Sequence, residues 1–459
     1  MSTFRSSDLP PAVSLRPPHV LIAGAGIGGL MLANILEKTD ITYEIFEKSK
    51  EIKPLGSTTC LNPTVMPAFE QLGLYEDLLE ISHPVSTGVL RNADAKIESL
   101  IDCGDNNETA GYEYALVARA RLYELLLSRV PPEKIIPGKR VVSFLQNKEG
   151  VMVRFQDRTT IHGDILVGAD GTYSGVRQHL FKELNKMGKL PKSDQKLPTS
   201  GHICMVGYTT PFDPETYPEL KSNRGHTDVM ISNKSPWSWN TTNLRGHVVA
   251  WSASRQLNSE EFAYEHLKNS EWSPEMFEPL VKEVSDFKTP YGTLGSLIEA
   301  TPKECISRVF LEKKFFETWT YSRTVLIGDG AVNAIQDAIV LANCIYEMRE
   351  NSYDAIFTAL TSYREQQYDY SKTQYESSKF NGKVFYGHTI FDRALRHILA
   401  NYLPPSARAQ SVAKIMAYRP QIAFLPLIPN RGTAEVESQK PSAKYLEQQA
   451  WLANAVQAT

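Results

Sequence analysis

A glycine-rich turn between a strand and a helix near the N-terminus constrains the fold of this chain more than any other feature. The apolar run 19–23 predicts a buried strand, and it leads directly into Gly24, Gly26 and Gly29. An apolar helix follows over 30–38, and a second strand comes after it. A strand, a tight turn, a helix and a second strand form a βαβ unit, so the sequence predicts an α/β fold built on a parallel sheet.

The order of residues in this turn is the one that a dinucleotide-binding site requires. The first glycine permits a sharp bend, the second lets backbone amides approach a pyrophosphate, and the third lets the helix pack close to the sheet. The second strand ends at Glu47, where a carboxylate can accept hydrogen bonds from ribose hydroxyls. A turn that merely packs is the alternative interpretation. The full βαβ context favours a dinucleotide site at Gly24, Gly26, Gly29 and Glu47.

Two later strands also end in pairs of aspartate and glycine. The strand at 164–167 leads to Asp170 and Gly171, and the strand at 325–327 leads to Asp329. Ligands of α/β sheets bind at the carboxyl ends of the strands. For either aspartate alone, a turn-forming Asp before Gly is a plausible alternative. Together with the first motif, they favour one extended cofactor site along this edge.

These three motifs, in this order, resemble those of the single-component FAD-dependent hydroxylases of the para-hydroxybenzoate hydroxylase and ubiquinone-pathway type. The similarity is greatest to their fungal relatives in meroterpenoid biosynthesis, and it covers about residues 18–380. It implies a split Rossmann-type FAD-binding domain with an inserted β-sheet substrate domain and a helical C-terminal extension. It also implies FAD as cofactor, NAD(P)H as co-substrate and O₂ as oxidant. No second GxGxxG motif follows residue 29, which favours this family over two-domain monooxygenases of the Baeyer-Villiger kind.

The resemblance assigns a role to the residues of the first motif and to one arginine. Gly24, Gly26 and Gly29 are expected to hold the FAD pyrophosphate, and Glu47 the adenosine ribose. Arg119 matches an arginine that lies near the FAD phosphates, although an exposed charge at a helix start is the alternative.

The resemblance also assigns roles to residues further along the chain. Asp170 and Gly171 match a motif tied to both FAD and pyridine nucleotide, and Arg177 is expected to act in flavin reduction. Asp329 matches the residue that bonds the ribityl chain of FAD. Cys60 belongs to a segment that passes near the flavin.

One departure from the family concerns the loop after Asp329. Family members carry a His-x-x-x-Pro-x-x-Gly-x-Gly loop there, which lets backbone amides approach the flavin ring. In this chain Asp329 is followed directly by Gly330 and Ala331, which match the end of that loop, so most of it is missing. The main alternative is therefore a flavin-binding protein with impaired or no monooxygenase activity.

The expected function is an FAD-dependent monooxygenase that hydroxylates or epoxidises a small apolar phenolic, polyketide or prenylated substrate. A Trp-Ser-Trp sequence at 237–239 is similar to part of a flavin halogenase motif, so halogenation is a minor alternative. The five cysteines are never closer than 39 residues and no histidines stand in ligand spacing, so no metal site is expected.

Charge and hydropathy narrow the range of partners. The net charge of −3 gives no basic field for nucleic acid. No run of about 18 apolar residues is present, so no transmembrane segment is expected, while peripheral membrane contact stays open. The scattered cysteines favour a cytoplasmic location. The expected division is a flexible leader at 1–17, an FAD-binding domain at 18–180 and 301–380, a β-rich substrate domain at 181–300 and a C-terminal extension at 381–459.

Overall fold

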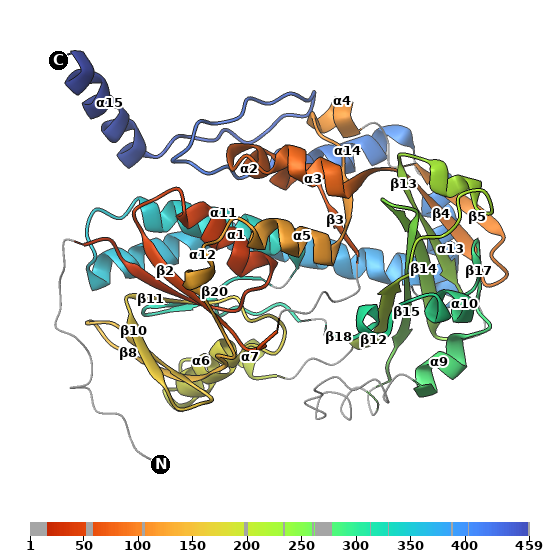
Figure 1. The fold of residues 1–459 in the computed structure, drawn as a ribbon, viewed down its shortest axis with the longest axis horizontal. Helices are drawn as coiled ribbons and strands as arrows, with labels where there is room; N and C mark the ends of the chain where they lie inside the picture. The colour runs from red at the N-terminus through yellow and green to blue at the C-terminus, as the bar shows by residue number, and fades with distance from the viewer. Residues whose placement is uncertain are drawn as a thin grey trace.

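The computed structural model describes most of the chain (Figure 1). The described residues are 16–51, 58–102, 106–196, 201–232, 235–258, 261, 278–312, 314–328, 330–386, 389–402 and 404–457. Asp329, which the sequence predicts to bind the ribityl chain, lies outside these residues.

A six-stranded sheet in the order β19-β20-β11-β1-β2-β7 forms the centre of one half of the molecule. Five of its strands run parallel, and β19 is antiparallel to β20. The six strands are β1 (His19–Ala23), β2 (Thr42–Glu47), β7 (Ile135–Pro137), β11 (Ile165–Gly168), β19 (Thr320–Tyr321) and β20 (Thr324–Leu326). This topology confirms the expected Rossmann-type α/β fold.

Both faces of this sheet are covered. Successive side chains of a strand point to opposite sides, so each strand contributes to two cores. Val20 and Ile22 of β1 join the core formed with α1 (Ile27–Leu36) and α11 (Ala331–Tyr346). Leu21 and its neighbour Ala23 pack on the other face, in a core shared with a three-stranded sheet. That sheet contains β8 (Val141–Gln146), β9 (Val151–Phe155) and β10 (Thr160–Gly163), and it is packed near α6 (Gly175–Lys186).

A nine-stranded sheet forms the other half of the molecule, at the right in Figure 1. The strand order is β18-β12-β15-β14-β13-β4-β6-β3, with β5 paired to β4. The strands are β3 (Thr58–Leu61), β4 (Ser82–Asn92), β5 (Ile97–Asp102), β6 (Ala115–Ala118), β12 (Gly201–Tyr208), β13 (Gly225–Ile231), β14 (Trp237–Leu244), β15 (Val248–Gln256) and β18 (Ser307–Glu312). Strands β3 to β6 and β18 come from outside 181–300. The nine-stranded sheet therefore contains strands from outside the predicted substrate domain at 181–300. The domain limits themselves stay a prediction.

Helices connect the two sheets and form the C-terminal region. The helices not yet named that precede the last third of the chain are α2 (Met66–Gln71), α3 (Tyr75–Ile81), α4 (Asn106–Ala110), α5 (Arg119–Leu127), α7 (Lys192–Gln195), α9 (Glu278–Val284) and α10 (Leu294–Glu299). The later ones are α12 (Tyr353–Tyr386), α13 (Ile390–Tyr402), α14 (Pro405–Ala417) and α15 (Ala443–Gln457), which confirm a helical C-terminal extension. None of the helices in the described ranges has the length and apolarity needed to cross a membrane.

Candidate functional site

The glycine turn after β1 is closely packed at its first and third glycines. Gly24 has φ +104°, and a Cβ there would lie 2.5 Å from the carbonyl oxygen of Ala169. A Cβ on Gly29 would lie 2.1 Å from the carbonyl oxygen of Gly24. The backbone itself therefore requires glycine at both positions, because the end of β11 and the start of α1 lie against the turn.

Gly26 differs from Gly24 and Gly29, because no contact with the described residues requires a glycine there. Its φ of −75° and ψ of −177° suit any residue. The nearest atom to a Cβ at this position would be the carbonyl oxygen of Ala169, at 4.0 Å. Gly26 is also the N-cap of α1, and no side-chain hydrogen bond caps that helix. The space and the polarity of the helix start fit a phosphate group.

Glu47 at the end of β2 faces this turn. Its carboxylate accepts hydrogen bonds from the backbone amides of Ala25, at 3.0 Å, and Ser49, at 2.9 Å. Burial, with a contribution from the charge of Glu47, raises the pKa of Tyr123 to about 12. Arg119 is the exposed first residue of α5, one turn before Tyr123. Glu47 and the helix that carries Arg119 are therefore neighbours beside the turn.

Asp170 follows β11 and is partly buried. Its Oδ2 accepts hydrogen bonds from the amides of Gly175, at 2.7 Å, and Val176, at 3.3 Å, in the first turn of α6. Burial raises the pKa of this carboxyl group. Its other oxygen, Oδ1, has no hydrogen-bond partner among the described residues. Asp170 thus shapes the turn, as the alternative interpretation expected, and it retains one oxygen that can accept a further hydrogen bond.

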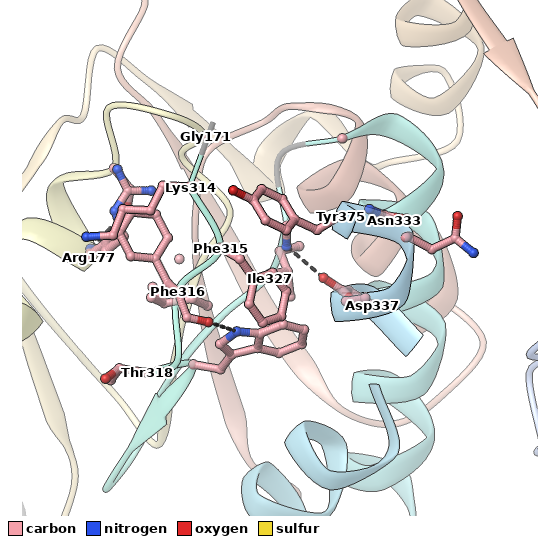
Figure 2. Close-up of a pocket in the computed structure, with 18 of the residues that line it drawn as sticks. Gly171, Arg177, Lys314, Phe315, Phe316, Thr318, Ile327, Asn333, Asp337 and Tyr375 are labelled. Atoms are coloured by element: carbon pink, nitrogen blue, oxygen red, sulfur yellow. Dashed lines mark hydrogen bonds between the residues drawn. The ribbon is translucent and has the colours of Figure 1, made fainter. Parts of the chain in front are cut away.

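A cavity of about 270 Å³ opens at the same edge of the sheet (Figure 2). It lies between the loop after β11, the end of β20, the start of α11, the segment 314–319 and α12. Three residues predicted from the sequence line it: Gly171, Arg177 and Gly330. The other described candidates do not, and they are Gly24, Gly26, Gly29, Glu47, Cys60, Arg119, Asp170 and Ala331.

One wall of the cavity combines two cations with an aromatic ring. The guanidinium carbon of Arg177 lies 4.6 Å from the ring centroid of Phe316, and the Nζ of Lys314 lies 4.7 Å from it. Arg177 also donates a hydrogen bond to the carbonyl oxygen of Thr172. Neither Lys314 nor Phe316 was predicted from the sequence. The only available signal was the aromatic run at 315–319 just before β19 and β20.

A buried carboxyl group holds the turn at the end of β20. Asp337 of α11 accepts a hydrogen bond from the backbone amide of Gly328, at 2.7 Å, through Oδ2 (Figure 2). Burial raises the pKa of Asp337 to about 7. Its Oδ1 has no hydrogen-bond partner among the described residues. Asp337 was not predicted from the sequence, because an acid in the middle of an apolar helix has no motif of its own.

The connection from β20 to α11 is short. The strand ends at Leu326 and the helix begins at Ala331, with Gly330 as N-cap and no side-chain cap. Cys60 lies elsewhere, on β3 opposite Leu116, and it is exposed. The start of α11 is therefore present at the sheet edge without a long preceding loop.

Comparison with known proteins gives the family. A family model described as an FAD binding domain matches residues 18–285, more than half of the chain. The chain belongs to this FAD-binding family. The FAD-dependent monooxygenase paxM of Penicillium paxilli is 27% identical over an alignment of 471 positions, gaps included, that covers 94% of this chain and 92% of that protein. The FAD-dependent monooxygenase ausM of Penicillium brasilianum is 25% identical, with 93% and 91% covered.

Solved structures show the same fold. Klebsiella pneumoniae HpxO, complexed with FAD and uric acid, superposes with a TM-score of 0.68 at 19% identity, covering 88% of this chain and 97% of that one. CtdE, complexed with FAD and a substrate, gives a TM-score of 0.63 at 13% identity, covering 87% and 98%. The family and the named relatives identify this flavoprotein as an FAD-dependent monooxygenase. Neither a flavin-binding protein without activity nor a halogenase finds support in them.

Proposed function

We propose that this FAD-dependent monooxygenase uses NAD(P)H and O₂ to hydroxylate or epoxidise a small apolar phenolic, polyketide or prenylated molecule. FAD, when bound, supplies the redox chemistry that carries electrons to O₂. The protein binds and orients this cofactor and limits the access of water to it. We also retain the cytoplasm as the expected site of action.

The observation that carries the proposal is the space beside Gly26. Gly24 and Gly29 are glycines because the backbone leaves no room for a Cβ, but the protein itself leaves room at Gly26. The start of α1 has no side-chain cap, and a bound pyrophosphate would occupy this space and accept hydrogen bonds from the backbone. We therefore assign the FAD pyrophosphate to Gly26 and the α1 N-terminus.

The other predicted residues fit the remainder of a cofactor of this length. Glu47 accepts one hydrogen bond from a backbone amide at each carboxylate oxygen. Each oxygen has a second lone pair that can accept a hydrogen bond from a ribose hydroxyl. The charge of Arg119 at the start of α5 suits a phosphate. Asp170 offers its buried Oδ1.

The cavity beside Gly171 suits only one end of FAD, since drug-sized ligands usually need roughly 300–1,000 Å³. We assign this cavity, with Arg177, Gly330 and the start of α11, to the reactive end of the cofactor. A place near the flavin for Cys60 and a bond from Asp329 to the ribityl chain stay predictions, since Cys60 does not line this cavity and Asp329 lies outside the described residues.

Replacing Gly26 with valine tests the proposal. Because a Cβ meets nothing closer than 4.0 Å, Gly26→Val should fold, with a thermal unfolding midpoint close to that of the unchanged protein. The branched side chain should occupy the phosphate space and abolish the flavin absorbance of the purified protein. Gly26→Ala is the matched control and should lose less flavin. A folded valine variant with full FAD occupancy would overturn the assignment.

A further inference from the structure

Helix α13 presents an apolar face outward. Its large exposed side chains are Ile390, Phe391, Ile398 and Tyr402, and Phe391 is 86% exposed. Spacings of three, four and seven among positions 390, 391, 394, 398 and 402 place these residues on one side of the helix. A surface helix of a folded protein ordinarily points its apolar stripe toward the core, so α13 has the reverse orientation.

The inward side of α13 is polar and is held in place. Arg396 is buried and donates a hydrogen bond to the carbonyl oxygen of Val384 on α12, at 3.0 Å. The negative charge of Glu98 on β5 acts on the same guanidinium. Asp392 is also buried, and it forms a reciprocal cap with Thr389 at the helix start. Turning the apolar side of α13 inward would break the hydrogen bonds of Arg396 and Asp392. These bonds therefore fix the orientation in which the apolar side faces outward.

The apolar face of α13 continues onto neighbouring elements. In Figure 1, α13 lies next to β5 in the half of the molecule that holds the nine-stranded sheet, and the two elements are in contact. Seven of the fifteen large apolar side chains that are exposed among the described residues lie on α13, β5 or the end of α12. These seven are Ile97, Leu100, Phe380, Ile390, Phe391, Ile398 and Tyr402, and we call them the α13 face. Single exposed apolar residues are ordinary, but a concentration of this kind marks an interaction surface.

The charge around the α13 face is positive, which favours a negatively charged partner over a second copy of this chain. Its surrounding helices carry more basic than acidic side chains over 372–402. The basic residues that are not buried are Lys372, Lys379, Lys383 and Arg393, and the acidic one over the same range is Glu376. Arg396 and Asp392 are buried, and β5 adds the exposed Glu98. Two copies of this face would place like charges against each other in a symmetric dimer. An anionic lipid surface would instead receive the apolar side chains below its headgroups and attract the lysines and arginines.

We propose that the α13 face docks this monooxygenase onto an anionic membrane surface. The helix lies along the interface, with Phe391 and Ile398 inserted among the lipids and Lys379 and Lys383 at the headgroups. The contact is peripheral, and it involves none of the residues assigned to FAD.

Vesicle flotation of the FAD-loaded protein tests this docking. The unchanged protein should float with vesicles of phosphatidylcholine and phosphatidylserine, and it should bind phosphatidylcholine alone at least about tenfold less. Phe391→Glu with Ile398→Glu should lower the partition onto the mixed vesicles by about tenfold or more. Lys379→Glu with Lys383→Glu should lower binding to the mixed vesicles only, and added salt should reduce the same component.

Phe357→Glu is the matched control. Phe357 is an exposed aromatic residue on α12, about 35 Å along the helix from Phe380, and its substitution should leave vesicle binding unchanged. The FAD content and unfolding midpoint of every variant should match the unchanged protein, which separates this test from that of the FAD assignment. Absence of vesicle binding by the unchanged protein would overturn the proposal. So would a dimer in light scattering that Phe391→Glu with Ile398→Glu converts to monomers without any effect on flotation.

Discussion

Two helices, α1 and α11, begin at the same edge of the six-stranded sheet, yet their starts are built differently. Both have a glycine N-cap and no side-chain cap. The start of α1 is fixed by backbone contacts, since Gly24 and Gly29 approach neighbouring carbonyl groups. The start of α11 follows a turn that a buried carboxyl group, Asp337, holds through the amide of Gly328. The first arrangement depends on local sequence, and the second depends on a side chain well inside the helix.

A substitution at Gly29 should have the largest effect, because backbone contacts at this glycine fix the start of α1. Gly29→Ala would place a Cβ 2.1 Å from the carbonyl oxygen of Gly24, and backbone atoms cannot yield at that distance without moving α1. We expect a loss of more than about 4 kcal/mol in the free energy of unfolding, or no soluble protein. Gly26→Ala should change it by less than about 1 kcal/mol. Urea unfolding of both variants measures the contrast, and equal losses would refute the distinction between the two glycines.

The contrast also explains what the sequence could and could not reveal. The glycine turn, Glu47 and the acid–glycine pairs after β11 and β20 are contiguous motifs, so they could be read directly, as could the short connection to α11. Lys314 and Phe316 reach Arg177 only through the fold, from a segment more than 130 positions later. The nine-stranded sheet likewise joins β3 to β6 with β12 to β15 and β18, a pairing of distant strands that local periodicity does not encode.

The turn that Asp337 holds before α11 can be tested through the pH dependence of the free energy of unfolding. A carboxyl group with an ordinary pKa of 3.8 has one of about 7 in the folded protein, so the folded state keeps a proton that the unfolded chain has lost. Stability should therefore fall as the pH rises from about 4 to 7. This residue alone accounts for roughly 2 to 3 kcal/mol between pH 5 and pH 8.

Asp337→Asn should remove that part of the pH dependence, because an amide has no proton to lose. Urea unfolding of the flavin-free protein at pH 5 and pH 8 measures the slope. Asp369→Asn, at an exposed position of α12, serves as control and should keep the slope of the unchanged protein. An unaltered slope in Asp337→Asn would show that this carboxyl group is ionised in the folded state.

Glu47 sharpens the comparison on the α1 side. Glu47→Ala removes the acceptor of two backbone amides and the proposed partner of the adenosine ribose. We expect FAD to bind more weakly by about 1.5 to 3 kcal/mol, the contribution of a charged hydrogen bond. Glu47→Gln keeps an acceptor and should lose less. Fluorescence titration with FAD gives the affinities, and an unchanged affinity in the alanine variant would leave Glu47 with a purely structural part in the turn.

Arg177 sits on the α11 side and should produce the smallest effect on binding. Its guanidinium stacks on Phe316 at the wall of a cavity that no residue of the glycine turn lines. Arg177→Ala should therefore retain most of the flavin while slowing its reduction by NAD(P)H, by roughly tenfold or about 1.4 kcal/mol in the barrier. Stopped-flow absorbance at equal flavin content separates flavin binding from the rate of flavin reduction.

Lys314→Ala is the matched control, because Lys314 lies over the same ring and its loss removes an equal charge from the same wall. If both variants slow reduction equally, the wall acts through its total positive charge. If only Arg177→Ala does, the planar guanidinium itself positions the reductant. Normal reduction in Arg177→Ala would remove this residue from the reductive step.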